Sequence, residues 1–304
     1  MQPLQLFAHF YPEFDHYWQI EMDTRFTSHV GSMLQGFHSF STSQPYKQAR
    51  ERASWAYIPK LHGTYAEFSR AINETMEGEA TVWGPIKIEE LEPKGPVPPV
   101  ENGRDDNFEW GVGRDADLVI LDQLNEVGRF ERTEDWVFRD WIGGGLPADT
   151  PRFVCVPAQA RASWDLLRAA HRAQHDLGLR VPSEATLPSF AAWHGLKTIS
   201  VPLPKFQFHE RDIGELAYVL NGGGLDQFKD GIAHGPGVYR GSSFNFFVRP
   251  MTWGWVPGLP NTIFDHWMKG PNEAKGERPL FMPESGGSVF APGLIIHPRK
   301  TNPG

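Results

Sequence analysis

The chain has 304 residues, of which 40% are hydrophobic and 22% are charged, a composition typical of a globular protein with a buried core. The net charge of −8 argues against nucleic acid as the main partner, because binding to phosphate backbones needs a basic surface. The sequence contains no run of ~18 apolar residues and therefore predicts no membrane span. The N-terminus "MQPLQLFAHFYPEFD" lacks the basic start and the cleavage site of a signal peptide.

The N-terminal part of the chain predicts helices and a strand. Residues 1–10 are expected to be the end of a helix, and Pro12 marks a break after it. The stretch "DHYWQI" at 15–20 then predicts a short strand. Residues 28–40 and 64–77 both have the apolar spacing of a helix.

The helix expected at 64–77 begins with the pattern of a capping box, because Thr64 is followed three residues later by Glu67. Residues 83–110 are rich in proline and charge and have almost no apolar periodicity. We expect this segment to be a loop.

The middle of the chain predicts strands and helices with short connections. Strands are expected at 115–124 and 152–157, and helices at 162–178 and 182–195. Cys155, the only cysteine, lies in the second strand, so no internal disulfide can form. Its apolar neighbours predict a core residue rather than a nucleophile.

This order of elements predicts an α/β protein with a mixed, mainly parallel sheet flanked by helices. The helix at 182–195 is expected to be capped by Ser183, and the strand "LKTISVPLP" follows it. We expect a single domain over 1–304. Within it, 206–304 is predicted to be an irregular region rich in glycine and tryptophan, with a final apolar strand within 291–300.

Two carboxylates, Glu21 and Asp23, stand one residue apart at the end of the first predicted strand, and Arg25 follows two residues later. Residues at this spacing point to the same face of a strand. Acids at a strand end often only face water or pair with a neighbouring arginine. The alternative is a divalent-metal site, because Mg²⁺ and Mn²⁺ bind carboxylate oxygens together with substrate phosphates. Both interpretations stay open.

Two further residues have a structural and a functional interpretation. Glu184 stands at the start of a predicted helix, where it could complement the helix dipole or act as a general base. His297 ends the last predicted strand and could be structural or a metal ligand.

Several stretches occur in an order that resembles a known family. They are "WQIEMDTR", "HGTYAEF", "DADLVIL", "SEATLPSFAAWHGLK", "NGGG" and a terminal "IIHPRK". Along nearly the whole chain they resemble a large fungal family of uncharacterised proteins, which is itself similar to glycosyltransferases of the GT-A fold. The stretch "YWQIEMD" is also similar to "YWRVEP" of yeast-type α-mannosyltransferases, with Met22 in place of the proline.

The resemblance implies a metal-dependent enzyme that transfers a sugar from a nucleotide-sugar donor to an acceptor hydroxyl. Glu21 and Asp23 match the acid-x-acid motif that holds Mn²⁺ or Mg²⁺ against the donor diphosphate in GT-A enzymes, and Arg25 belongs to the same donor-binding stretch. Glu184 matches an acidic residue at the start of a helix that lines the acceptor site, which is the base in inverting members. His297 matches a late histidine that many GT-A enzymes keep on the metal.

The sequence departs from this family pattern in two places. Only 20 residues precede Glu21, whereas GT-A domains normally begin well before this motif. The N-terminal part of the nucleotide-binding half of the sheet is therefore expected to be missing. Family members also often have "SEMWP" where this chain has "SEATLP", so the acceptor contacts are expected to differ.

Two other functions stay open. The chain could be a non-catalytic relative that serves as a binding or partner subunit, or a metal-dependent hydrolase that uses the same acids on phosphate esters. The donor sugar, the acceptor, the stereochemical outcome, the oligomeric state and the compartment do not follow from the sequence. A secretory, Golgi-like location would require an anchor upstream of this chain.

Overall fold

The computed structural model describes residues 2–22, 24–26, 29–76, 83–127, 146–147, 150–155 and 159–203, and three short strands at 284–285, 288–289 and 295–296. The described residues form two compact units. One unit takes its described residues from 2–19 and 38–202, and the other takes them from 20–37, 203 and the three C-terminal strands. Most of the region 206–304 lies outside the described residues.

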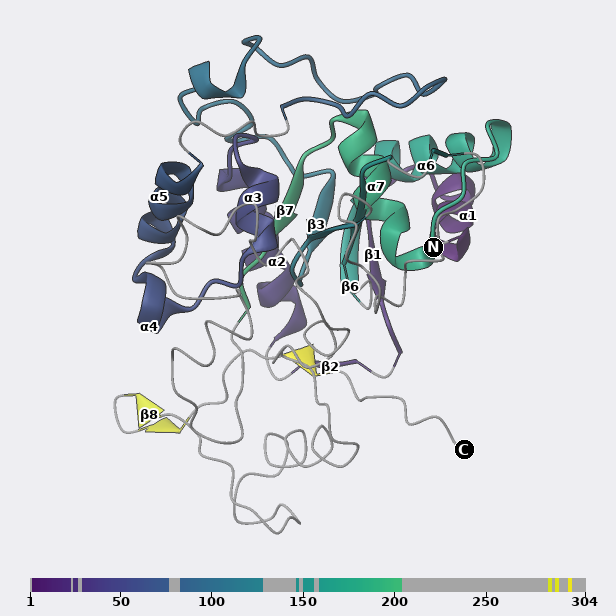
Figure 1. The fold of residues 1–304 in the computed structure, drawn as a ribbon. Coiled ribbons are helices and arrows are strands. Elements are labelled where there is room, and N and C mark those ends of the chain that lie inside the picture. Colours follow the sequence, from purple (N-terminus) through teal and green to yellow (C-terminus); the bar gives the residue numbers. More distant parts are fainter. Residues whose placement is uncertain are drawn as a thin grey trace, which may run out of the picture. The chain divides into compact units, whose positions relative to one another are not determined.

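A four-stranded mixed sheet forms the centre of the first unit, in the order β1-β6-β3-β7 (Figure 1). Its strands are β1 (His16–Ile20), β6 (Gln159–Ser163), β3 (Leu118–Ile120) and β7 (Thr198–Ser200). The predicted α/β class is therefore confirmed. Strand β3 runs parallel to β7 and antiparallel to β6, which makes the sheet mixed.

The residues of β3 form the middle of the core. Leu118, Val119 and Ile120 have no exposed surface, and because their side chains alternate between the two faces, both faces of the sheet are covered. Two helices supply much of this cover: α6 (Trp164–Asp176) and α7 (Ser183–His194). Figure 1 shows them beside α1 (Gln2–Phe10), whereas α3 (Ala49–Ser54) lies next to β7.

Helix α6 lies within the predicted range 162–178 and has a defined cap at each end. The hydroxyl of Ser163 accepts a hydrogen bond from the backbone N–H of Leu166 at 3.1 Å, which caps the first turn. After the last turn, Gly178 adopts a φ of +67°, a conformation that glycine takes without strain. The helix predicted at 162–178 is thus confirmed with slightly shorter bounds.

Helix α7 corrects one expectation. Ser183 is the first residue of the helix rather than its cap, and the capping position belongs to Pro182, which makes no side-chain hydrogen bond. The hydroxyl of Ser183 instead donates to the carboxylate of Glu184 at 2.6 Å. Gly195, with a φ of +68°, ends the helix as expected.

The segment between β1 and β3 contains α2 (Val30–Ser43), α4 (Pro59–His62) and α5 (Tyr65–Thr75), in addition to α3. The capping box of α5 is confirmed. The N–H of Glu67 donates to the hydroxyl of Thr64 at 3.2 Å, and the N–H of Thr64 donates to the carboxylate of Glu67 at 2.7 Å. Phe68 and Ile72 of this helix are fully buried.

Residues 83–110 contain one short 3-10 helix, η1 (Gly103–Asp105), and no other helix or strand. The segment is nevertheless held against the C-terminal end of α7. The N–H of Ile86 donates to the carbonyl of Ala192 at 3.1 Å, and the N–H of Gly95 donates to the carbonyl of His194 at 2.7 Å. Proline-rich sequence here gives an irregular segment with fixed backbone contacts.

The remaining described strands form three small pairs. Strand β4 (Asn125–Val127) pairs antiparallel with β5 (Arg152–Val154), and β8 (Glu284–Ser285) pairs antiparallel with β9 (Ser288–Val289). In the second unit, β2 (Arg25–Phe26) pairs antiparallel with β10 (Ile295–Ile296).

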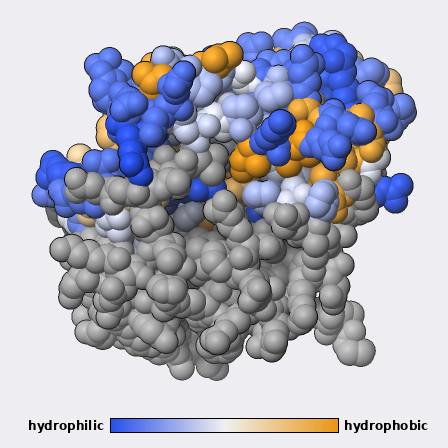
Figure 2. Space-filling view, turned by 45° about the horizontal axis from the view of Figure 1, so that its top comes forward, coloured by the Kyte–Doolittle hydropathy of each residue, from blue (hydrophilic) through white to orange (hydrophobic). Residues whose placement is uncertain are grey.

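The described surface is mostly hydrophilic on the face shown in Figure 2. Hydrophobic residues gather mainly on the side of that view on which Figure 1 places α1, α6 and α7. None of the helices in the described part of the chain combines the length and the apolar character that crossing a bilayer would require.

Candidate functional site

Glu21 follows the last residue of β1 directly and lies partly buried at the start of a turn. The N–H of Thr24 donates to the carbonyl of Glu21 at 3.0 Å, which reverses the chain, and Arg25 then begins β2. The predicted position at the end of a strand is therefore confirmed for Glu21. The expectation that Glu21 and Arg25 share one face of a single strand is wrong, because β1 ends at Ile20 and the chain turns before Arg25. Asp23 lies outside the described residues.

The pairing of β2 with β10 brings together two segments that are far apart in the sequence. Arg25 lies opposite Ile296 and Phe26 lies opposite Ile295, which is 1% exposed. His297 follows Ile296 directly in the sequence but lies outside the described residues. The backbone of the second unit therefore places the segment after the acid-x-acid motif beside the segment that leads to the predicted histidine.

Glu184 lies in the first turn of α7, in the first unit, and is partly buried. Pro188, four residues later, has no N–H, so the carbonyl of Glu184 lacks its usual partner within the helix. The N–H of Cys155, just after β5, donates to this carbonyl at 3.2 Å. The sequence "SEATLP" thus fixes the backbone of Glu184 against the end of a strand.

Cys155 is buried and free, as its sequence predicts. Burial raises the pKa of its thiol strongly, and the nearby carboxylates of Asp122 and Glu184 raise it further. A thiol held in its protonated form is a poor nucleophile, so Cys155 is a core residue.

The described part of the chain contains no group of three His, Cys, Asp or Glu side chains that could hold a metal ion. Of the three predicted metal ligands, only Glu21 belongs to that part.

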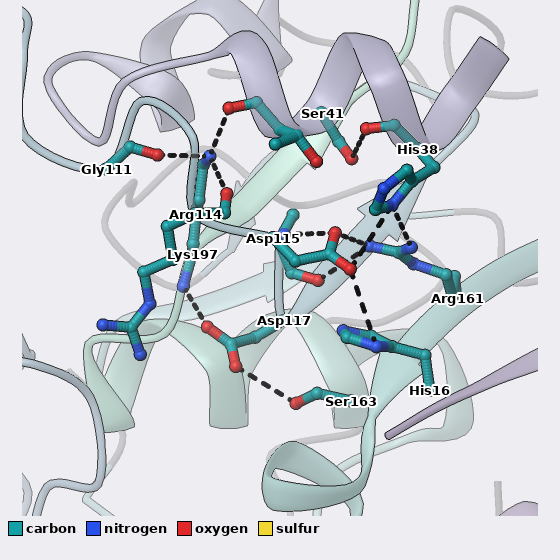
Figure 3. Close-up of polar contacts among 12 residues, drawn as sticks. His16, His38, Ser41, Gly111, Arg114, Asp115, Asp117, Arg161, Ser163 and Lys197 are labelled. Carbon is teal, nitrogen blue, oxygen red and sulfur yellow. Dashed lines mark hydrogen bonds and ion pairs between the residues drawn. The ribbon is translucent and has the colours of Figure 1, made fainter. Parts of the chain in front are cut away.

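A network of charged side chains at the start of β3 did not follow from the sequence (Figure 3). Arg161 of β6 donates to the carboxylate of Asp115 and, at 3.1 Å, to the carbonyl of Ala116. The Nδ1 atoms of His16 and His38 lie 3.7 and 3.4 Å from the same carboxylate. Burial alone would raise the pKa of Asp115, but the guanidinium of Arg161 outweighs it and lowers this pKa.

Asp117, two residues further on, is more deeply buried and has neutral partners. Its carboxylate accepts the backbone N–H of Lys197 at 2.9 Å and the hydroxyl of Ser163 at 3.1 Å. Burial raises the pKa of Asp117 despite these two bonds. The pKa values of Asp115 and Asp117 are therefore shifted in opposite directions. Such a combination can supply a base and an acid in one place.

Lys197 extends the network into the core. Its side chain has no exposed surface, and its Nζ donates to the carbonyls of Gly111 at 2.8 Å and Arg114 at 2.6 Å, and to Thr42 at 3.5 Å. Burial lowers the pKa of Lys197 to about 8. With its ammonium directed at backbone carbonyls, Lys197 connects α2 and the loop at 111–114 to the start of β7.

This network borders an open pocket of about 320 Å³ in the first unit. The lining residues come from the turn before β1, the start of β3 and the start of α6: Pro12, Phe14, Asp15, His16, Arg114, Asp115, Asp117, Ser163, Trp164 and Asp165. The only sequence signal for this site was the acid-x-acid pattern of "DADLV", directly before an apolar strand.

The family comparison assigns no activity. The model of a family described as protein of unknown function (DUF3405) matches residues 1–301. The chain belongs to this family. No curated protein and no solved structure gives a significant match.

Proposed function

We propose that this member of the DUF3405 family is a metal-dependent glycosyltransferase of the GT-A kind, which transfers a sugar from a nucleotide-sugar donor to an acceptor hydroxyl. The observation that carries the proposal is the pairing of β2 with β10. It supports a shared site for the acid-x-acid motif and the late histidine, because the strand that follows the motif pairs with the strand that precedes the histidine. The mixed α/β fold is compatible with this class.

The proposed metal ligands are Glu21, Asp23 and His297. Carboxylate and imidazole groups suit Mn²⁺, and carboxylates suit Mg²⁺. The cation would neutralise the charge that develops on the leaving nucleoside diphosphate. Arg25, in β2, is the proposed partner of a diphosphate oxygen, since guanidinium groups bind phosphates with two hydrogen bonds.

Glu184 is the proposed general base of an inverting reaction. It would take the proton from the acceptor hydroxyl as this oxygen attacks the anomeric carbon. The backbone bond from Cys155 to Glu184 supports this role, since a base needs a fixed position. In a retaining reaction Glu184 would position the acceptor instead.

Calorimetry with nucleoside diphosphates tests the donor site. We expect the wild-type protein to bind at least one of them only when Mn²⁺ is present, and the Asp23→Ala variant to lose this binding. The matched control is Asp105→Ala, which removes an exposed aspartate in η1 and should bind as the wild type does. A folded wild-type protein that binds no nucleoside diphosphate with Mn²⁺ would contradict the proposal and favour a non-catalytic relative.

A second measurement separates binding from chemistry. The Glu184→Gln variant keeps the shape of the side chain but removes the base. We expect it to bind the nucleoside diphosphate normally and to lose at least 100-fold in transfer rate, the usual contribution of a general base. Transfer at the wild-type rate would show that Glu184 is not the base.

A further inference from the structure

The pocket of about 320 Å³ at the start of β3 has the size of a small ligand site, since such sites begin at about 300 Å³. His16 begins β1, whereas Glu21 follows the other end of that strand. Among the described residues, neither Glu184 nor the predicted donor-binding residues Glu21 and Arg25 line the pocket. Its ligand is therefore a separate question from the transfer reaction.

The charges in the pocket have both signs. Four aspartates line it, but Arg114, His16 and the N-terminal turn of α6 lie in the same wall. The inner two carboxylates already have partners, because Asp115 accepts from Arg161 and Asp117 accepts from Ser163 and Lys197 (Figure 3). An anion would meet the aspartates, and a cation would meet Arg114 and the positive end of the helix dipole.

A neutral ligand with many hydroxyl groups fits this mixture better than either ion. Each hydroxyl can donate to a carboxylate and accept from a guanidinium or an imidazole. Hydrogen bonds to charged groups are also the stronger ones. A carboxylate oxygen of Asp115 or Asp117 has more than one lone pair, so its present bonds leave room for a further donor.

Two aromatic residues belong to the lining, and the guanidinium of Arg168 lies over the ring of one of them, Trp164. Phe14 stands at the pocket with 53% of its surface exposed, and Trp164 is partly buried. The backbone N–H of Trp164 donates to the backbone carbonyl of Asp15 at 2.8 Å, which fixes the two sides of the pocket to each other. A ligand with one apolar and one polar face could cover the exposed ring of Phe14 and hydrogen-bond to the carboxylates at the same time.

From this combination we infer that the pocket is a binding site for a neutral saccharide unit, held by Asp15, Asp115, Asp117, Arg114 and the rings of Phe14 and Trp164. None of these residues belongs to the proposed donor-binding set of Glu21, Asp23, Arg25 and His297. The pocket would hold a sugar residue of a glycan without taking part in transfer.

Saturation-transfer NMR with metal-free and nucleotide-free protein tests this inference. The probes are mannose, glucose, galactose, N-acetylglucosamine and their disaccharides, with glucosamine and glucuronic acid as a cationic and an anionic probe. We expect at least one neutral sugar to bind. A protein that binds none of the neutral sugars, or binds only the charged probes, would overturn the inference.

Two pairs of exposed variants locate the site. Phe14→Ala and Asp15→Ala should each weaken binding of the neutral sugar by about tenfold, the effect of one lost contact. Phe10→Ala and Glu13→Ala remove neighbouring exposed side chains that do not line the pocket and should leave binding unchanged. Equal binding in Phe14→Ala, Asp15→Ala and the wild type would also overturn the inference. Because Asp23→Ala should bind the sugar normally, failure of the donor-site proposal would be visible separately.

Discussion

The hydroxyl of Ser189 bonds to both backbone polar groups of Phe153. The N–H of Phe153 donates to Oγ at 2.9 Å, and Oγ donates to the carbonyl of Phe153 at 3.1 Å. Trp193 adds a bond from its indole N–H to the carbonyl of Pro151 at 2.8 Å, and Glu184 accepts from Cys155. Three positions of α7 thus hold the strand segment 151–155, and the same contacts fix the backbone of Glu184.

Removing the hydroxyl in Ser189→Ala should therefore lower the free energy of unfolding by about 2 kcal/mol, because the N–H and the carbonyl of Phe153 both lose their partner in a buried site. Ser189 is 0% exposed and Phe153 1% exposed, so water cannot replace the bonds without a local opening. Urea denaturation measures the change. The control Ser43→Ala, at an exposed position in the last turn of α2, should change stability by less than about 0.5 kcal/mol.

We expect the free energy of unfolding to fall in weak acid because of two buried histidines. Burial lowers the pKa of His62 and of His194 to about 4. Below pH ~6.5 both histidines bind a proton in the unfolded chain, whereas in the folded chain they stay neutral until pH ~4. Their contribution is therefore complete above pH ~6.5 and is lost as the pH falls through this window, by on the order of 2 kcal/mol for each histidine.

Burial keeps both rings neutral, and their Nδ1 atoms have different partners. The Nδ1 of His62 accepts the N–H of Ile58 at 2.8 Å, and the Nδ1 of His194 lies 3.1 Å from the carbonyl of Glu92. Asparagine can offer an acceptor or a donor at the Nδ1 position but does not titrate. Urea denaturation between pH 4 and 7 should show a weaker pH dependence in His62→Asn and His194→Asn than in the wild type. His175→Asn, on the exposed end of α6, should keep the wild-type slope.

Local sequence rules predicted the parts of this fold that depend on near neighbours. Thr64 and Glu67 are three residues apart, and their capping box followed directly from that spacing. The partners of Asp117 are Ser163 and Lys197, which stand 46 and 80 residues away. No periodicity encodes such contacts, because they depend on the order of strands in the sheet. For the same reason the pairing of Arg25 with Ile296 could be expected only from the family resemblance.

The buried ammonium of Lys197 leads to a third prediction of stability. Lys197→Met keeps most of the side-chain volume but removes the ammonium donor from the carbonyls of Gly111 and Arg114, of which Gly111 keeps the N–H of Arg114 as a second donor. We expect the free energy of unfolding to fall by about 2–4 kcal/mol. Lys94→Met removes an exposed lysine that pairs with Glu92 at 2.7 Å and should cost less than about 1 kcal/mol. Similar losses in the two variants would mean that the bonds of Lys197 contribute little.

Two glycines should respond to alanine in opposite directions. A Cβ at Gly95 would overlap the carbonyl oxygen of Gly195 and come within 2.7 Å of the carbonyl oxygen of His194. Since Gly95 also donates to His194, Gly95→Ala must push the segment 83–110 away from α7, at a cost of about 1–3 kcal/mol. A Cβ at Gly36, inside α2, meets nothing within 4 Å, so Gly36→Ala should stabilise the protein by about 0.5–1 kcal/mol. Thermal unfolding of the two variants checks both signs, and a stable Gly95→Ala protein would show that the loop is not held against α7 in solution.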